Sequence, residues 1–166
     1  MDGRWYQIPR IEPLSLNNAY RTATTKKGVP IRVKTTAAKK YLKRVQEEMR
    51  TIDHVRGSKH LPHAFYDIHY IFLTGELGWF FKNGKLRKKD VSNMLKLTED
   101  AVFTYFGNDE DDAQVVDVHG HKRIRPVPGE ESSILIYVSP SSLDAPVWID
   151  GEAFELHQLM GLGCVQ

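Results

Sequence analysis

Apolar side chains recur at helical spacing through residues 90–105, and this period is the strongest constraint on how the chain can fold. At about 100° per residue, one face collects Val91, Met94, Leu95, Thr98, Ala101, Val102 and Tyr105. Asn93, Lys96 and Asp100 fall on the opposite face. The segment is therefore predicted to be a helix with one buried side. Asp90 stands at its start, where unpaired backbone amides favour a carboxylate.

The other patterned segments predict one more main helix and several strands. A helix capped by a threonine is predicted for residues 35–52. Strands are predicted for residues 4–11 at a sheet edge, 31–34, 64–75 at the sheet centre, and 113–124 and 132–140 as antiparallel neighbours. Asn83-Gly84 indicates a hairpin within residues 79–88. Residues 15–30 are expected to form a polar loop, and residues 152–160 a short helix.

The order of these elements predicts an α/β fold of the α+β type. A chain of 166 residues is long enough for one domain with a core. We expect a mixed, largely antiparallel sheet of about five strands packed with two main helices, within residues 1–140. Residues 141–166 are expected to be a peripheral C-terminal extension. The absence of a Gly-x-Gly-x-x-Gly or P-loop pattern argues against dinucleotide or nucleoside-triphosphate chemistry.

Composition indicates a soluble, cytoplasmic protein. The chain is 41% hydrophobic and 27% charged, and its net charge is only +2. Cys164 is the only cysteine, so an intrachain disulfide is excluded and a reducing compartment is expected. The sequence contains no signal-peptide pattern and no stretch of roughly twenty apolar residues, so no membrane association is expected.

Consecutive acidic residues, from Asp109 to Asp112, immediately precede the predicted strand at residues 113–124. Such acidic runs usually point into water from a loop. Alternatively, carboxylates from several elements hold a hard cation that relieves their repulsion. The residues after Asp109 do not fit an EF-hand, because Gly120 stands where a bidentate glutamate is needed. Mg²⁺, which uses one or two carboxylates plus phosphate oxygens, suits this arrangement.

Cations surround the acidic segment. A basic hairpin contributes Lys82, Lys85, Arg87, Lys88 and Lys89, and the strand that follows the acids ends in Lys122, Arg123 and Arg125. A projecting basic hairpin can follow a phosphate backbone. A hairpin guarded by lysines against edge aggregation has the same composition and is about as common. His119 and His121 alternate on the same strand, where they could chelate a soft metal, although an exposed strand face is the commoner explanation.

The order of these motifs resembles the RusA-like Holliday junction resolvases, small homodimeric endonucleases of phage and prophage origin. The core positions that match are Asp90, Val91, Ser92, Asn93, Lys96, Asp100, Asp111, Asp112, Gln114, Val115 and Lys122. The N-terminal pattern is matched by Pro13, Ser15, Asn17 or Asn18, and Tyr20. The resemblance covers residues 11–138, and its ordered set of short motifs is fairly specific.

The resemblance implies hydrolysis of four-way DNA junctions by a homodimer, with Mg²⁺ or Mn²⁺ as cofactor. It implies Asp90, Asp111 and Asp112 as metal ligands, and a catalytic set of Asp90, Lys96 and Asp112. Ser92, Asn93 and Asp100 are expected next to the metal. The residues expected to bind DNA are Asn18, Tyr20, Lys82, Lys85, Arg87, Lys88, Lys89 and Lys122.

One position departs from the family pattern. Ser92 stands where these enzymes usually carry a second aspartate at the helix start, so one metal carboxylate is missing. Ser92 binds the ion through a water, a neighbour such as Glu110 or Asp111 replaces the charge, or catalysis is weakened. The departure motivates a second hypothesis, a junction-binding protein that does not cleave. A third hypothesis is an RNA- or protein-interaction module whose acids form a solvated loop.

Overall fold

The structure is a computed structural model, and it describes the chain in several segments. These are residues 3–57, 65–87, 89–106, 115–124, 131–142, 147–149 and 152–154. Lys88 and the acidic segment from Asp109 to Asp112 lie outside the described residues.

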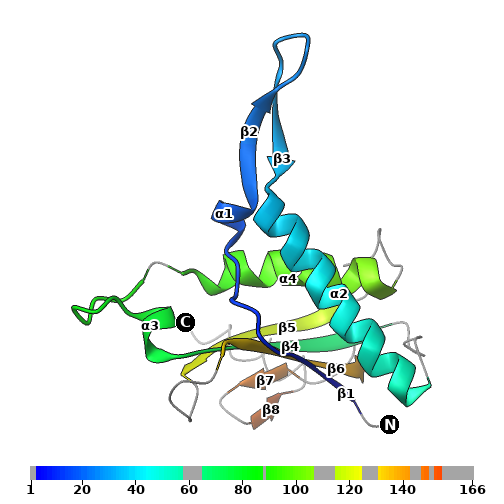
Figure 1. Cartoon of the computed structure of the whole chain (residues 1–166). Coiled ribbons are helices and arrows are strands. Elements are labelled where there is room, and N and C mark those ends of the chain that lie inside the picture. The colour runs from blue at the N-terminus through cyan, green and yellow to red at the C-terminus, as the bar shows by residue number, and fades with distance from the viewer. Residues whose placement is uncertain are drawn as a thin grey trace, which may run out of the picture.

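A four-stranded sheet forms the centre of the fold (Figure 1). Its strands are β1 (Arg4–Ile8), β4 (Phe65–Thr74), β5 (Val115–Ile124) and β6 (Ser133–Ser141), in the order β1-β6-β4-β5. β6 is antiparallel to both of its neighbours, and β4 and β5 are parallel. The predicted class, α+β with a mixed and largely antiparallel sheet, is therefore confirmed, with four strands in the main sheet.

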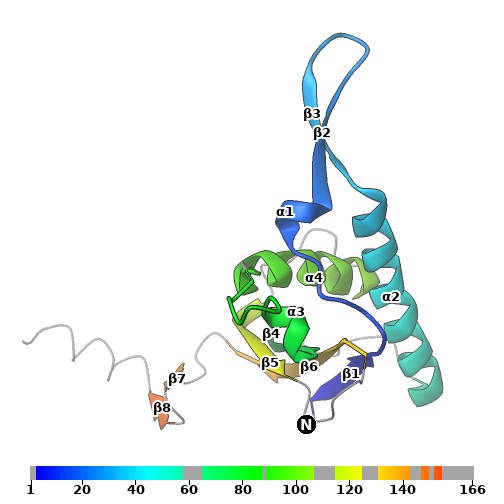
Figure 2. The ribbon, with the colours of Figure 1, turned by 60° about the vertical axis from the view of Figure 1, so that its left-hand side comes forward.

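Two long helices, α2 (Thr36–Arg56) and α4 (Val91–Phe106), cover one face of this sheet (Figure 2). The buried core lies between them and the sheet and includes Tyr6, Tyr70, Phe72, Val45, Met49, Met94, Leu97 and Ile136. The side chain of Thr35 caps α2 by accepting a hydrogen bond from the Ala38 amide, as predicted. Gly57, in a left-handed conformation with φ 72°, ends the helix.

Two sequence expectations about the strands are wrong. β5 and β6 are not neighbours, because β4 lies between them and pairs with both. Residues 15–30 do not form a loop throughout. They contain the short helix α1 (Leu16–Ala19) and β2 (Tyr20–Thr24), which pairs with β3 (Pro30–Lys34) in an antiparallel hairpin. We call residues 20–34 the basic arm, and it projects away from the sheet and its helices (Figures 1 and 2).

The remaining elements are short. α3 (Glu76–Trp79) follows β4 and leads into the predicted Asn83-Gly84 turn, which is closed by a single antiparallel bridge between Phe80 and Leu86. β7 (Val147–Ile149) pairs with β8 (Glu152–Phe154). The helix predicted for residues 152–160 is thus wrong for 152–154, and its other residues lie outside those described. None of the helices in the described residues is long and apolar enough to cross a membrane.

Candidate active site

Asp90 caps the start of α4 with its side chain. Its Oδ1 accepts a hydrogen bond from the backbone amide of Ser92 at 3.0 Å, and its Oδ2 accepts one from Nδ2 of Asn93 at 3.4 Å. The carboxylate is exposed, and each carboxylate oxygen can accept more than one such bond. Asp90 is therefore held in place by its own helix and still has lone pairs available to a cation.

The apolar side of α4 holds the start of the helix against the edge strand β5. A Cβ added to Gly120 would come within 2.5 Å of Val91 Cγ1 and 2.7 Å of Leu95 Cδ1, so the head of the helix lies directly on the strand backbone. Met94 and Leu97, one turn further along, are fully buried. The absence of a side chain at position 120 thus allows Val91 and Leu95 to pack directly on β5.

The polar face predicted for α4, which carries Asn93, Lys96 and Asp100, faces the base of the basic arm, and we call it the polar ridge. Asp100 Oδ2 lies 4.0 Å from Nζ of Lys34, the last residue of β3, and both side chains are more than a third exposed. Lys96, on the same ridge, is exposed and makes no ion pair or hydrogen bond with the described residues. Its ammonium is therefore accessible to an anion from solution.

α2 and α4 are joined behind this ridge by a buried hydrogen bond. The hydroxyl groups of Tyr41 and Thr98 lie 2.7 Å apart. Burial raises the pKa of Tyr41, so its phenol stays protonated at any pH at which the protein would act. The spacing between the ridge and the first turns of α2 is thus set by a contact that does not titrate.

Two of the lysines predicted to bind DNA lie against Trp79. The ammonium groups of Lys89 and Lys122 are 5.5 and 5.6 Å from the centre of the indole ring, within the range of cation–π attraction. Lys122 also donates to the carbonyl oxygen of Lys89, and the indole nitrogen of Trp79 donates to the carbonyl of Arg123 at 2.9 Å. These contacts tie the residues leading into Asp90 to the end of β5.

Glu12 completes this group, although it was not predicted from the sequence as a site residue. Its Oε1 pairs with Lys89 Nζ at 2.5 Å, and its Oε2 accepts from Ser132 Oγ at 2.5 Å. Glu12 directly precedes Pro13 of the N-terminal motif, and this position is the only sequence feature that could have indicated a role in the site. The pair holds the N-terminal segment against the residue before Asp90.

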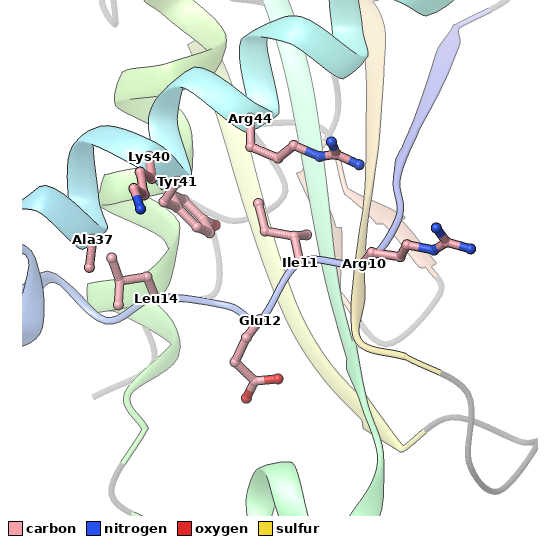
Figure 3. Close-up of a pocket in the computed structure, with 8 residues that line it drawn as sticks. All are labelled: Arg10, Ile11, Glu12, Leu14, Ala37, Lys40, Tyr41 and Arg44. Carbon is pink, nitrogen blue, oxygen red and sulfur yellow. The ribbon is translucent and has the colours of Figure 1, made fainter.

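Glu12 also lines a shallow groove of about 300 Å³ between the N-terminal segment and α2. Arg10, Lys40 and Arg44 come from its two walls, and Ile11, Leu14 and Tyr41 supply apolar surface between them (Figure 3). Two of these cations already have acidic partners, since Arg10 pairs with Glu131 and Arg44 with Glu48. The groove is therefore a cationic surface beside the candidate site rather than an enclosed pocket.

The other predicted DNA-binding residues divide between two projections. Lys82 and Lys85 are exposed on the Asn83-Gly84 turn. The guanidinium of Arg87 packs against its own turn, because its Nε donates to the Phe80 carbonyl and its central carbon lies 4.6 Å from the Phe81 ring centre. Lys88 lies outside the described residues.

Asn18 and Tyr20 form the base of the basic arm. The carbonyl of Asn18 accepts from Oγ1 of Thr35, the residue that caps α2. Tyr20 opens β2, and the guanidinium of Arg32 lies 5.1 Å from its ring centre.

The arm itself carries cations that were not predicted to form a surface. They are Arg21, Lys26, Lys27, Arg32 and Lys34, with no acidic residue among residues 20–34. A run of cations without acids was visible in the sequence, but only strand pairing shows that it is a projecting arm.

The carboxylates predicted to share a metal with Asp90 are Asp111 and Asp112, and both lie outside the described residues, as does Gln114. Within the described part of the chain, no three His, Cys, Asp or Glu side chains converge as a metal site. Neither a protein-family model nor a curated protein sequence matches this chain.

Proposed function

We propose that this protein is a divalent-metal-dependent endonuclease that resolves four-way (Holliday) DNA junctions as a homodimer, as the RusA-like family does. The observation that carries the proposal is the position of Asp90: an exposed carboxylate, held at the head of a helix whose apolar side is buried, beside the polar ridge that faces the projecting basic arm (Figure 1). A junction has twofold symmetry, which a C2 dimer matches.

Mg²⁺ or Mn²⁺ is the proposed cofactor, and the donor set is a hard one. Asp90 would hold the ion together with Asp111 and Asp112, while Ser92 and Asn93 lie beside it. When bound, such an ion supplies an activated water and neutralises charge at the phosphate. The exposed Lys96 would contact the phosphate or orient the water, because its ammonium is not used by the described residues.

The proposed DNA path follows the cations on the same side of α4. The Lys34–Asp100 pair brings the arm to the polar ridge, so a duplex lying along the arm reaches Lys96 and Asp90. Lys82 and Lys85 on the second projection would contact the backbone beyond the site. Lys89 and Lys122 are partly engaged with Trp79 and would position the site in addition to contacting phosphate.

Cleavage of a synthetic four-way junction tests the proposal. We expect nicks in opposing strands with Mg²⁺ or Mn²⁺, and loss of at least about a hundredfold in rate for Asp90→Asn and for Asp112→Asn. Junction affinity measured with Ca²⁺ should be retained by both variants. The matched control is Glu47→Gln, an exposed carboxylate on α2, which should cut like the parent. If the two Asp→Asn variants cut at the parental rate, the catalytic assignment is wrong.

A second candidate function is junction binding without cleavage, and Ser92 favours it. Its side chain is an exposed hydroxyl at the position where a further carboxylate would face the ion. This function predicts salt-sensitive junction binding and no nicking with any divalent metal. Ser92→Asp separates the possibilities: a gain of nicking from an inactive parent would show that the missing carboxylate is the cause, and no gain would count against that explanation.

A further inference from the structure

The face of the main sheet turned away from α2 and α4 carries a group of histidines. Along β4, alternate residues from Tyr66 to Phe72 are buried against the helices, while His69 points to the other side and is half-buried. An irregularity in the pairing between Tyr66 and Asp67 brings His119 and His121 of β5 onto this same face. Neither of the main helices covers it (Figure 2).

The pairing of β4 and β5 places the three imidazoles side by side. His69 is the register partner of His119, and their rings lie 4.3 Å apart with planes 12° from parallel. His121, two residues further along β5, has its ring 6.2 Å from that of His69 with planes 5° from parallel. Two histidines at alternate positions of one strand are thus joined by a third from the adjacent strand.

We propose that His69, His119 and His121 form a metal site for a transition-metal ion that prefers imidazole, of which Zn²⁺ is the first candidate. Three imidazole nitrogens around one Zn²⁺ leave a fourth position open, as in a three-ligand tetrahedral site. Imidazole also suits Ni²⁺ and Cu²⁺ but not Mg²⁺, so the site is chemically distinct from the carboxylate set at Asp90. The proposal does not depend on the nuclease function.

The three imidazoles must leave their stacked arrangement before they can share one ion. Zn–N bonds of about 2.0–2.1 Å in a tetrahedral site place the ligand nitrogens roughly 3.3 Å apart, with the rings pointing outward from the ion instead of stacked on one another. As they stand, the rings are stacked and do not converge, in keeping with the finding for the described residues as a whole. The strand register already puts the three side chains on one face, so metal binding would require new rotamers that turn their nitrogens toward a common point.

Two carboxylates lie beside the histidines on the same strands, and metal-bound imidazoles commonly donate their second N–H to a carboxylate. Asp67 lies two residues from His69 on the same face, and its register partner is Asp117. Asp67 Oδ1 is buried and has no hydrogen-bond partner among the described residues, so it is available to orient an imidazole N–H.

The proposed metal site lies on β5, the strand against which the head of α4 packs. Gly120, which lies between His119 and His121 in sequence, faces the opposite way and contacts Val91 and Leu95 at the head of α4. A metal at the histidines therefore ties β5 to β4 directly behind that contact.

Calorimetric titration of the full chain with Zn²⁺, in excess Mg²⁺ to saturate any carboxylate site, tests this proposal. We expect one Zn²⁺ per chain and at least about tenfold weaker binding for His69→Gln, His119→Gln and His121→Gln. Asp67→Asn should weaken binding by about tenfold. His54→Gln, an exposed histidine near the end of α2, is the matched control and should bind like the parent.

A spectroscopic measurement on the unmodified chain keeps the test decisive if a variant fails to fold. Co²⁺ in place of Zn²⁺ should give the intense visible absorption of a tetrahedral ion. In a separate titration with Zn²⁺, NMR of the histidine rings should show chemical-shift changes at His69, His119 and His121 alone. Absence of saturable Zn²⁺ binding overturns the proposal. So does binding that persists unchanged in the three variants, or ring shifts confined to other histidines.

Discussion

Gly120 is the residue on which the geometry of the candidate site depends most directly. It lies on the edge strand β5 beneath the first turn of α4, where any side chain would meet Val91 and Leu95. The position of this first turn also sets the position of Asp90, which directly precedes Val91.

Gly120→Ala tests this contact. The added methyl group must displace Val91 and Leu95, so we expect a loss of about 1–3 kcal/mol in the free energy of unfolding, measured by urea denaturation. Junction cleavage should fall further than stability explains, because Asp90 moves with the helix head. Gly75→Ala is the matched control, since a Cβ there meets nothing within 4 Å. Equal stability of the two variants would contradict the proposed packing.

At the scale of the elements, the basic arm is the part that most needs a test. Its strands pair from Tyr20 to Lys34, and Thr25 closes the tip by bonding to Val29 through both backbone and side chain. The arm is thus a paired hairpin, and its exposed cations are held at fixed positions along it.

Removing two charges from the tip should weaken junction binding. We expect Lys26→Gln/Lys27→Gln to raise the Kd about tenfold at low salt and to reduce the slope of log K against log salt by about 0.9 for each phosphate that the arm no longer neutralises. The comparison is Lys43→Gln/Arg50→Gln, which removes the same charge from α2. If both double variants lower affinity and slope equally, the arm has no special role and only net charge matters.

Elements with an apolar period could be predicted from the sequence, but the pairing of exposed segments could not. α2, α4, β1 and β4 each bury one or both faces, so their hydrophobic spacing predicted them. The basic arm is exposed on most of its residues, including Val29 and Ile31. The strand predicted at residues 31–34 is present as β3, but β2 and its pairing with β3 have no buried side to show in the sequence. The adjacency of β4 and β5 also escaped prediction, because it joins residues far apart in the chain.

In the candidate site, too, the residues of one helix could be predicted from the sequence, and residues joined by tertiary structure could not. Asp90, Asn93, Lys96 and Asp100 lie on one helix, so helical periodicity alone places them on one side. Glu12 and His69 reach their neighbours only through tertiary pairing, and no local pattern indicates it. Convergence of Asp90 with Asp112 also depends on tertiary structure, and it stays a prediction.

At the scale of the whole molecule, a single carboxylate links the sheet and both long helices. Asp53 of α2 is 3% exposed, and its Oδ2 accepts from the hydroxyl of Tyr6 on β1 at 3.2 Å and from that of Tyr105 on α4 at 2.9 Å. Three elements that are distant in sequence thus share one buried acceptor.

Loss of the Asp53 carboxylate should lower the stability of the whole fold, because it removes the hydrogen bonds between β1, α2 and α4. Asp53→Ala leaves two buried phenols without it, so we expect the free energy of unfolding to fall by about 2–4 kcal/mol. Asp53→Asn should cost less, because the amide oxygen still accepts. Urea denaturation followed by both tryptophan fluorescence and circular dichroism gives the measurement. A loss for Ala no greater than for Asn would show that the shared acceptor contributes little.

The buried triad of Asp53, Tyr6 and Tyr105 predicts how the free energy of unfolding changes at alkaline pH. Burial raises the pKa of Tyr6 from 10.0 to about 12, against the opposing effect of Arg4 and with a further rise from Asp53. The unfolded chain therefore releases this proton first, and the contribution of Tyr6 to stability is complete below about pH 10 and is lost between about pH 10 and 12. Burial and Asp53 also raise the pKa of Tyr105, which adds to the decline.

Tyr6→Phe removes one of these titrations and identifies its share. The free energy of unfolding of the variant should be lower than that of the parent at neutral pH, because the hydrogen bond to Asp53 is lost. Its decline above pH 10 should be less steep, because one fewer phenol ionises on unfolding. Denaturant midpoints measured between pH 8 and 12 would show the two curves converging. Parallel curves would mean that Tyr6 titrates alike in the folded and unfolded chains, and that the buried triad does not protect its proton.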